Sequence, residues 1–337
     1  MTPKVSIVIL NYNGRIHTLN CLRSLKKMSY HNCEIILYDN GSKEDISKEI
    51  KKLYGKVRVI RRKDNIGYSA GSTDAYRYAR GKYVLFLNND TTVTPRFLTH
   101  LVKRMESAPA NGIVQPKLVF LRTKKLQAGC TFLTPTGFLY YTGYGKDPNA
   151  PQYNIPGEIY SANGACMLVK REVVDTVGLF DKDFFLYFEE TDFCHRALLA
   201  GYKIWYEPAA VIYHIGSVDN STYKYAILVY YSCRNRIISY VKNLGVFRLL
   251  TMLPVHIFLN IGLAGAYVLS GKPESSWAVI KALVYNAGHI KSIWKKRRQV
   301  QHSLRSLSDS EFLPGVSRAP RFEYYMRLMS GLERYKD

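Results

Sequence analysis

The sequence lacks the glycine-rich signatures of two common kinds of nucleotide-binding site. No Gly-x-Gly-x-x-Gly follows the first strand-like segment, which disfavours a dinucleotide-dependent dehydrogenase, and no Gly-Lys-Ser/Thr phosphate loop occurs. The six cysteines form no Cys-x-x-Cys pair and show no zinc-like spacing, so we expect reduced thiols in a cytosolic compartment. Internal repeats and low-complexity tracts are absent, and we expect no signal peptide because Met1 leads almost directly into a strand-like segment.

Acidic residues are scarce compared with basic ones. Lys and Arg number 48 against 26 Asp and Glu, which gives a formal net charge of +22. Such a balance favours an anionic partner, whether nucleic acid, anionic lipid or a phosphorylated substrate. The 337 residues are 47% hydrophobic, which predicts a sizeable core in one large domain or in a domain with an appendage.

The first part of the chain alternates strand-like and helical segments. Short apolar runs predict four buried strands, at Val5–Leu10, Glu34–Tyr38, Val57–Ile60 and Tyr83–Leu87. Helical segments are predicted between them, at Ile16–Leu25, Glu44–Leu53 and Asn65–Tyr78. This alternation implies parallel strands joined by right-handed crossovers, so we expect a doubly wound α/β unit.

Polar side chains follow successive predicted strands where each strand ends. They are Asn11 and Asn13, then Asp39, then Asn65, and finally Asn89 and Asp90. Ligands gather at the carboxyl ends of strands in open α/β sheets, so this arrangement suits a nucleotide. Gly67 lets the backbone approach a ligand and opens a helix N-terminus that favours phosphate.

Asp90 and His214 together predict a metal site. Asp90 offers a hard oxygen ligand to Mg²⁺ or Mn²⁺, although Asp and Asn are also ordinary turn residues. His214 ends a later apolar run, Val211–His214, although a lone His is more often structural than a ligand. We expect a divalent-metal site, because the Asp and the His each lie at a strand end, on either side of an acidic segment.

Three carboxylates, Glu189, Glu190 and Asp192, fall within four residues at a predicted helix start in an aromatic setting. Burial of so much like charge is costly unless a cation, an Arg or a substrate compensates. A carboxylate in such a place often has a raised pKa and can serve as a general base. The alternative is an ordinary acidic helix N-terminus, where Glu and Asp favour the helix dipole.

The segment Leu249–Leu269 contains no Asp, Glu, Lys or Arg. About 18 or more such residues is the usual threshold for a membrane-spanning helix. Basic residues lie on both sides, at Lys242 and Arg248 and at Lys272 and Lys281, so a single span would place one basic flank on the wrong side. We therefore predict a re-entrant or interfacial hairpin in this segment.

The segment Trp277–Trp294 has apolar residues at helical spacing, with Lys281 and Lys295 off that face. This pattern predicts an amphipathic helix on a membrane surface, followed by the basic cluster Lys295–Arg298. A core-packing helix of a small C-terminal domain is the alternative. We expect the last thirty or so residues to form a polar, basic tail. Earlier in the chain, Leu139–Tyr144 is predicted as an irregular hairpin and Ile159–Val169 as a strand.

Together these motifs resemble the inverting glycosyltransferases of family 2, and within them the rhamnosyltransferase-like branch. The resemblance covers about the first 240 residues and rests on Val5–Asn13, Asp39-Asn40-Gly41-Ser42, Asn65-x-Gly67, Asn88-Asn89-Asp90, Asn163-Gly164-Ala165-Cys166, Glu189–Asp192 and His214. It implies an α/β GT-A fold with a Rossmann-like, mostly parallel sheet. The implied catalytic domain is 1–216, with a nucleotide-binding half at about 1–92 and an acceptor half at about 93–216. A linking helix at 217–245 and a helical, basic, membrane-interfacial region at 246–337 would follow.

The resemblance also implies roles on the donor side. Asp39 would contact the nucleobase, with the backbone around Asn11 lining its pocket. Asp90 matches the last position of the family's Asp-x-Asp motif and would hold a divalent metal, with His214 as a second ligand. Asn88 replaces the usual first Asp of that motif, which leaves fewer charges on the metal. Further donor-binding residues would be Asn13, Asn65, Gly67 and Asn89.

On the acceptor side, the resemblance implies that Glu190 is the catalytic base. Glu189 and Asp192 would support it or bind acceptor hydroxyls. Glu190 stands where Asp is commoner in the family, so the assignment within the cluster stays open. The acceptor would be bound by Asn163, Gly164 and Arg234.

The implied function is metal-dependent transfer, with inversion, of rhamnose or another hexose from a nucleoside-diphosphate sugar of the UDP or dTDP type. The acceptor would be a glycan or a polyprenyl-linked glycan in cell-surface polysaccharide or glycoconjugate synthesis. We expect a cytoplasmic enzyme, peripheral or monotopic on the inner, anionic face of the cell membrane. Three alternatives remain: a sugar-phosphate nucleotidyltransferase, a catalytically inactive scaffold, and a basic nucleic-acid-binding protein. Against the last, the sequence has no helix-turn-helix, zinc-finger or RNA-recognition signature, and we expect no nucleic-acid partner.

Overall fold

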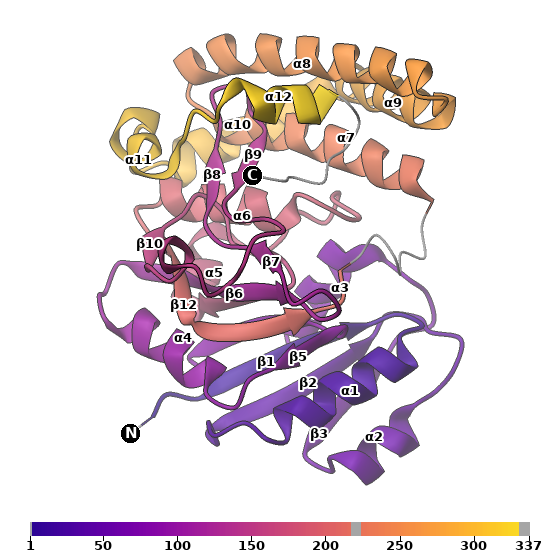
Figure 1. The fold of residues 1–337 in the computed structure, drawn as a ribbon, viewed down its shortest axis with the longest axis vertical. Helices are drawn as coiled ribbons and strands as arrows, with labels where there is room; N and C mark the ends of the chain where they lie inside the picture. Colours follow the sequence, from indigo (N-terminus) through magenta and orange to yellow (C-terminus); the bar gives the residue numbers. More distant parts are fainter. Residues whose placement is uncertain (1, 217–223, 330–337) are drawn as a thin grey trace.

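The computed structural model describes residues 2–216 and 224–329. In these residues a ten-stranded mixed sheet runs in the order β10-β12-β6-β11-β4-β1-β2-β3, with β5 beside β12 and β7 beside β6. Helices cover the sheet, and a layer of C-terminal helices lies over one end of the molecule (Figure 1).

The N-terminal half has the predicted parallel arrangement. Its strands are β1 (Val5–Asn11), β2 (Cys33–Asp39), β3 (Val57–Arg61) and β4 (Tyr83–Asn88). Their crossovers contain α1 (Arg15–Leu25), α2 (Ser47–Leu53) and α3 (Gly67–Tyr76). β1 pairs in parallel with both β2 and β4, so that Asn11 lies opposite Asp39, and Leu10 opposite Asn88. The polar residues that end these strands therefore meet at one edge of the sheet, as predicted.

The remaining strands make the sheet mixed. The elements in chain order are β5 (Thr91–Val93), α4 (Phe97–Glu106), β6 (Asn111–Phe120), β7 (Leu126–Ala128), β8 (Thr131–Leu133), β9 (Leu139–Tyr141), the 3₁₀ helix η1 (Pro151–Tyr153), β10 (Gly157–Glu158), β11 (Cys166–Lys170), α5 (Arg171–Val177), α6 (Glu189–Leu199) and β12 (Lys203–His214). β11 is antiparallel to both β4 and β6, whereas β12 is parallel to β6. β8 and β9 pair as an antiparallel hairpin, which places a strand in the predicted Leu139–Tyr144 hairpin region.

Two strand predictions need correction. The predicted strand Ile159–Val169 is a strand only from Cys166, because Asn163 and Gly164 form a turn in which Asn163 Oδ1 accepts from the Ala165 amide at 2.9 Å. The predicted Val211–His214 is the end of the much longer β12. A shift in register between Glu207 and Val211 interrupts its apolar pattern, which concealed the first half of the strand.

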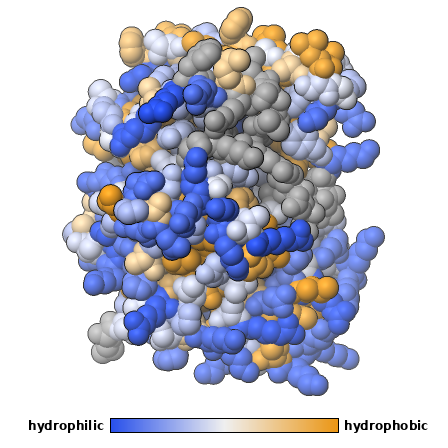
Figure 2. Space-filling view, in the orientation of Figure 1, coloured by the Kyte–Doolittle hydropathy of each residue, from blue (hydrophilic) through white to orange (hydrophobic). Residues whose placement is uncertain are grey.

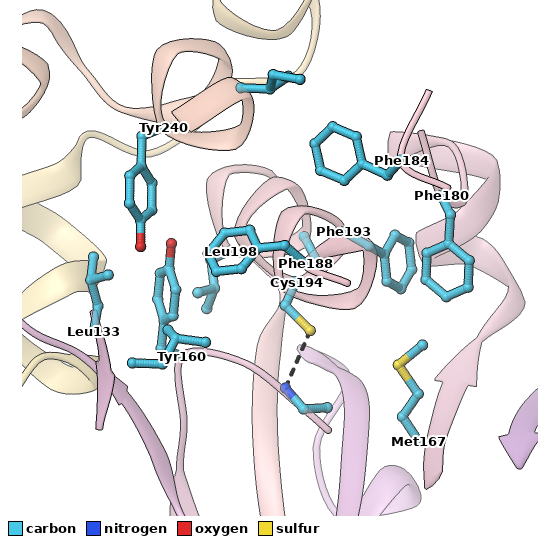
Figure 3. Close-up of a cluster of buried hydrophobic side chains, with 14 of the residues drawn as sticks. Leu133, Tyr160, Met167, Phe180, Phe184, Phe188, Phe193, Cys194, Leu198 and Tyr240 are labelled. Atoms are coloured by element: carbon cyan, nitrogen blue, oxygen red, sulfur yellow. Dashed lines mark hydrogen bonds between the residues drawn. The ribbon is translucent and has the colours of Figure 1, made fainter. Parts of the chain in front are cut away.

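The C-terminal part of the described chain is helical. It consists of α7 (Tyr225–Asn243), α8 (Val246–Leu269), α9 (Pro273–Gly288), α10 (Ile290–Ser303), α11 (Asp309–Val316) and α12 (Phe322–Met329). One hydrophobic cluster runs from the sheet through α6 into α7, α8 and α9, and it includes Phe188, Tyr240 and Tyr267. Figure 3 shows part of this core, where Tyr240 points toward Tyr160. The helices therefore share their core with the sheet.

Three predictions for this region are wrong in detail. Leu249–Leu269 is part of one continuous helix and no hairpin, because His256 and Asn260 mark its protein-facing side and not a turn. Trp277–Trp294 is divided between α9 and α10, which meet at Gly288 and His289. The expected tail contains α11 and α12, and α11 begins with a Ser308–Glu311 capping box that the sequence pattern already carried.

Candidate active site

A cavity of about 540 Å³ opens at the carboxyl ends of β1 and β4, beside the start of α6. Nine predicted site residues line it: Asn13, Asn65, Asn89, Asp90, Asn163, Gly164, Glu189, Glu190 and His214. The other predicted residues, Asn11, Asp39, Gly67, Asp192 and Arg234, do not line it. The cavity thus brings residues from six segments of the chain together, as expected for a ligand site in an α/β fold.

The end of β12 brings His214 to Asp90, which follows β4. His214 Nε2 lies 3.1 Å from Asp90 Oδ1, and both side chains are largely buried. On the other side of the ring, Nδ1 lies 2.9 Å from Gln127 Oε1.

These two side chains fit a divalent cation on a diphosphate. With Nδ1 donating to Gln127, Nε2 turns its lone pair toward Asp90, and it makes no well-aligned hydrogen bond within the described structure. An imidazole lone pair and a carboxylate oxygen at 3.1 Å form a donor set that a cation would stabilise. No group of three His, Cys, Asp or Glu side chains in the described residues makes a metal cage. One or two protein ligands plus phosphate oxygens is, however, the usual environment of Mg²⁺ in nucleotide sites.

The carboxylates Glu189 and Glu190 begin α6 after a strained turn. Tyr187 and Phe188 have φ values of +67° and +70°, a left-handed backbone that is unfavourable for bulky residues. Asn235 of α7 holds this turn, because its Nδ2 donates to the carbonyl oxygens of Leu186 (2.9 Å) and Tyr187 (2.7 Å). The ring of Phe188 is buried edge-on against Tyr240 of the same helix.

The two glutamates differ in environment. Glu189 is buried, its Oε2 has no hydrogen-bond partner in the described residues, and burial together with Glu190 raises the pKa of Glu189 well above its usual value. Burial raises the pKa of Glu190 to about 7, while the Thr191 hydroxyl lies 3.3 Å from its Oε1. Glu190 is less buried than Glu189, and its side chain lies against Gly164 of the opposite wall. Glu190 is therefore the better placed of the two to exchange a proton with a bound acceptor.

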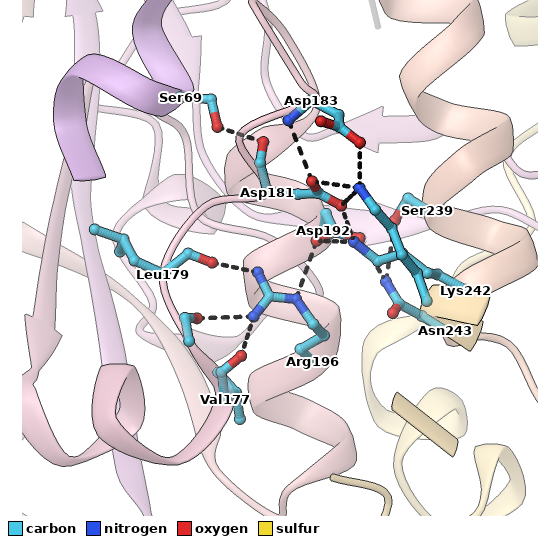
Figure 4. Close-up of polar contacts among 12 residues, drawn as sticks. Ser69, Val177, Leu179, Asp181, Asp183, Asp192, Arg196, Ser239, Lys242 and Asn243 are labelled. Carbon is cyan, nitrogen blue, oxygen red and sulfur yellow. Dashed lines mark hydrogen bonds and ion pairs between the residues drawn. The ribbon is translucent and has the colours of Figure 1, made fainter. Parts of the chain in front are cut away.

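Asp192 does not share this environment, which corrects the expectation that it binds acceptor hydroxyls. Its carboxylate is fully buried and accepts from Arg196 Nε (3.0 Å), Lys242 Nζ (3.0 Å) and Asn243 Nδ2 (2.9 Å). Figure 4 shows these contacts, with Lys242 also reaching Asp181. Although burial opposes it, Lys242 and Arg196 hold the pKa of Asp192 far below its usual range. Asp192 thus joins α6 to α7 and supports the glutamates only through the fold.

On the donor side, Asp39 and Asn11 lie behind the cavity wall. Asp39 accepts from Ser42, from Asn11 and from Arg61 Nε at 2.9 Å. Contact of Asp39 with a nucleobase stays a prediction, since the carboxylate is already engaged by these donors. Gly67 has φ +86° and packs on Phe185, where a Cβ would lie 2.5 Å from the Phe185 carbonyl oxygen.

Arg234, predicted to bind the acceptor, is buried away from the cavity. Its guanidinium lies 4.9 Å from the ring centroids of Tyr231 and Tyr285, and Nη2 donates to Asp183 O at 2.6 Å. It therefore braces the segment that leads into the strained turn before α6. Arg234 does not line the cavity, so its contact with an acceptor stays a prediction.

Several cavity residues were missed from the sequence, among them Tyr12, Asn40, Tyr68, Gln127 and Tyr187. Tyr12, Asn40 and Tyr68 are each next to a predicted site residue, so their positions in the sequence could have indicated that they line the cavity. Gln127 lies in β7, far along the chain from either Asp90 or His214, and no local pattern marks it. The Tyr68 hydroxyl donates to Gly164 O at 3.0 Å, which joins the donor side of the cavity to the wall that faces Glu190.

Comparison with known proteins gives a consistent result. The sequence profile of glycosyl transferase family 2 matches residues 6–178. The chain is 31% identical over 228 residues to an uncharacterized protein, y4gI, of Sinorhizobium fredii, a match that covers 63% of this chain but only 24% of that protein. It is 24% identical to the low-salt glycan biosynthesis hexosyltransferase Agl10 of Haloferax volcanii, over 71% of this chain and 76% of that one. It is also 24% identical to the N-acetylglucosaminyl-diphospho-decaprenol L-rhamnosyltransferase of Mycobacterium tuberculosis, over 64% and 76%.

Solved structures share the fold. A structure of GalNAc-T7 with UDP, GalNAc and Mn²⁺ superimposes with a TM-score of 0.58 at 18% identity, over 71% of this chain and 47% of that one. The mannosyltransferase PcManGT of Pyrobaculum calidifontis, in complex with GDP-Man and Mn²⁺, superimposes with a TM-score of 0.55 at 14% identity, over 89% and 85%. These likenesses identify the α/β fold as GT-A.

Proposed function

Because the chain belongs to glycosyl transferase family 2, and so is a glycosyltransferase that uses a nucleotide-sugar donor, we propose a specific reaction for it. The enzyme transfers a hexose from a nucleoside-diphosphate sugar to a lipid-linked glycan, with inversion at the anomeric carbon. The observation that carries the proposal is that one cavity joins Glu190, with a raised pKa, to the Asp90–His214 pair. A base and a diphosphate site facing one cavity are what a single displacement needs.

The proposed step is one in-line displacement. The acceptor hydroxyl oxygen forms a bond to the anomeric carbon of the donor sugar while the bond from that carbon to the diphosphate oxygen breaks. The hydroxyl proton passes to the Glu190 carboxylate, and the electron pair of the broken bond leaves with the diphosphate. Attack from the face opposite the leaving group inverts the configuration, and no protein nucleophile is required.

Asp90 and His214 would hold a Mg²⁺ or Mn²⁺ ion, with Gln127 fixing the imidazole. The ion supplies positive charge for the leaving diphosphate. Donor binding at this end is further favoured by Asn13, Asn65 and Asn89, whose amides line the cavity. The Mn²⁺ and nucleotide sugars of the GalNAc-T7 and PcManGT structures support the proposal by analogy of fold.

A lipid-linked acceptor is supported by the surface of the C-terminal helices. Among the described residues, α8 is the helix long and apolar enough to cross a membrane, but it is packed on the protein along one side. That side carries two polar residues among apolar ones: His256 is fully buried with Nδ1 2.9 Å from Thr136 O, Asn260 is 2% exposed, and Leu263 and Tyr267 are buried as well. The outward side is apolar, with Leu250 69% and Phe258 73% exposed.

An exposed apolar side of this kind is typical of a helix that lies in a membrane surface. Of the 16 large apolar side chains exposed in the described residues, 12 fall between Val246 and Trp294. Figure 2 shows apolar residues along the top edge of the molecule, over α8 and α9. Exposed basic residues accompany them, including Arg248, Lys291 and Arg298. We propose that this apolar face binds the anionic inner surface of the cell membrane.

A nucleotide panel tests the proposed donor. The full chain is heated with UDP, dTDP and GDP and their sugar forms, each with and without Mn²⁺. A ligand that binds only the folded state raises Tm, so we expect stabilisation by one nucleoside diphosphate that requires the metal. If no diphosphate stabilises the protein, the donor assignment fails. Stabilisation by a nucleoside triphosphate with release of pyrophosphate would favour the nucleotidyltransferase alternative.

A further inference from the structure

A second hollow, of about 500 Å³, lies between the N-terminal half of α7 and the first turns of α9. Its apolar and aromatic lining includes Ile227, Tyr230, Tyr231 and Trp277. Trp277 is 58% exposed, so a large aromatic surface faces this groove and the solvent. The groove is separate from the catalytic cavity and belongs to the helical layer that carries the apolar face.

The groove also carries positive charge. Lys224 and Lys281 line it, and both are exposed. Lys281 Nζ lies 5.7 Å from the ring centroid of Trp277, so its ammonium group is held at the aromatic wall. Among the lining residues that the structure describes, Glu274 is the one acid, against two lysines. A ligand with an anionic end and an apolar body matches this lining.

A stacked aromatic pair joins the lining of the groove to the lining of the catalytic cavity. The ring of Tyr231 in the groove stacks on the ring of Phe185, with centroids 5.4 Å apart and planes at 23°. Phe185 lines the catalytic cavity. Arg234 lies against Tyr230, Tyr231 and Tyr285 at 4.9–5.5 Å, which makes this wall a packed unit and no loose loop.

We propose that this groove binds the diphosphate and the first isoprenoid units of a polyprenyl-linked acceptor, so that the acceptor sugar enters the catalytic cavity past Phe185. The inference rests on the proposed function and names the part of the acceptor that the groove binds. Lys224 and Lys281 pair with the diphosphate, and Trp277, Tyr230 and Ile227 cover the prenyl chain. The rest of that chain continues along the exposed apolar side of α8 into the bilayer.

The test uses farnesyl diphosphate as the probe, with binding to the full-length protein measured by calorimetry. We expect saturable binding, and we expect farnesol and inorganic pyrophosphate to bind far more weakly, because each satisfies only one part of the groove. The double variant Lys224→Glu/Lys281→Glu should weaken farnesyl diphosphate binding by roughly tenfold or more through loss of two charge-assisted contacts. Lys52→Glu, which makes the same change on the exposed face of α2, should have no effect.

Two controls separate the possible failures. UDP with Mn²⁺ should bind the double variant as it binds the unchanged protein, which shows an intact fold and keeps the donor assignment independent of the groove. Vesicles of phosphatidylcholine with phosphatidylglycerol should not compete for the probe, because the groove selects the diphosphate. Unchanged probe affinity in the double variant, or full competition by these vesicles, overturns the proposal even if transferase activity is established.

Discussion

The imidazole Nε2 of His214 lies 3.1 Å from Oδ1 of Asp90, although the two residues are separated by more than a hundred positions in the chain. β4 and β12 end at this point, and Gln127 of β7 holds the far side of the ring. Two distant strand ends and one supporting amide therefore make a preformed ligand pair. The pair lies in the same cavity as Glu190.

Replacement of Asp90 should remove the metal dependence of donor binding. Asp90→Ala deletes the carboxylate of the pair and leaves the imidazole as its one remaining member, so Mn²⁺ should no longer increase the affinity for a nucleoside diphosphate. Calorimetric titration of the nucleotide with and without Mn²⁺ measures this. Asp64→Ala, an exposed acid near the same sheet edge, is the matched control. An Mn²⁺ effect of normal size in Asp90→Ala contradicts the assignment.

Transfer should show an acid limb near pH 7. Glu190 accepts a proton only when it is ionised, and burial raises its pKa to about 7, so kcat/KM should fall as the pH is lowered through that value. The stability of the fold depends on pH in the opposite direction. Because the pKa of Glu190 is raised in the folded state, its neutral carboxyl group stabilises the fold fully at a pH below the unfolded-state pKa, and this contribution is lost as the pH rises through about 7. A pH–rate profile from pH 5 to 9 tests the first statement. A limb near pH 4 would mean that an ordinary carboxylate is the base.

Asp192 should matter for stability more than its place in the acidic cluster suggests. Asp192→Asn leaves Lys242 and Arg196 buried beside a neutral group, and breaking a buried ion pair in this way costs about 3–5 kcal/mol. Urea unfolding, followed by circular dichroism, gives the free energy of unfolding. Asp183→Asn, a partly exposed partner of Lys296, should cost less than about 1 kcal/mol. Equal, small effects of both changes would contradict the structural role of Asp192.

The outward side of α8 should bind membranes without contributing to the core. Leu250→Glu/Phe258→Glu places two charges on exposed positions, so the free energy of unfolding should change little. Sedimentation with phosphatidylglycerol-containing vesicles should show loss of binding in this variant. Ile155→Glu, at an exposed apolar residue elsewhere, is the control and should sediment normally. If the unchanged protein stays in the supernatant at low salt, the membrane proposal is wrong.

The strand ends of the N-terminal half could be predicted because their information is local. β1, β2 and β4 are each short and mostly apolar, and each ends in a polar residue. The parallel crossover rule then places Asn11, Asp39 and Asn88 at one edge. The acidic start of α6 was similarly visible, because Glu189 and Glu190 stand next to each other in an aromatic segment.

The rest depends on contacts between distant segments. The sequence could not distinguish the role of Asp192 from the roles of Glu189 and Glu190. The distinction comes from Lys242 and Asn243, about fifty residues away, which donate hydrogen bonds to the Asp192 carboxylate. Gln127 has no motif of its own, and its role depends on where β7 lies beside the end of β12. In α8 the sequence indicated apolar character but not which side faces the protein, since the buried side contains the polar His256 and Asn260 together with apolar residues such as Leu263.

The most direct test of the account is the rate of sugar transfer by Glu190→Gln. The amide keeps the shape of the side chain but cannot accept a proton, so loss of a general base should lower kcat by about 10²-fold or more. Donor binding with Mn²⁺ should stay normal, because Asp90 and His214 are unchanged. The account predicts this separation of binding from transfer in Glu190→Gln, and a smaller loss in Glu189→Gln. Near-normal turnover in Glu190→Gln, with transfer abolished in Glu189→Gln instead, would contradict it.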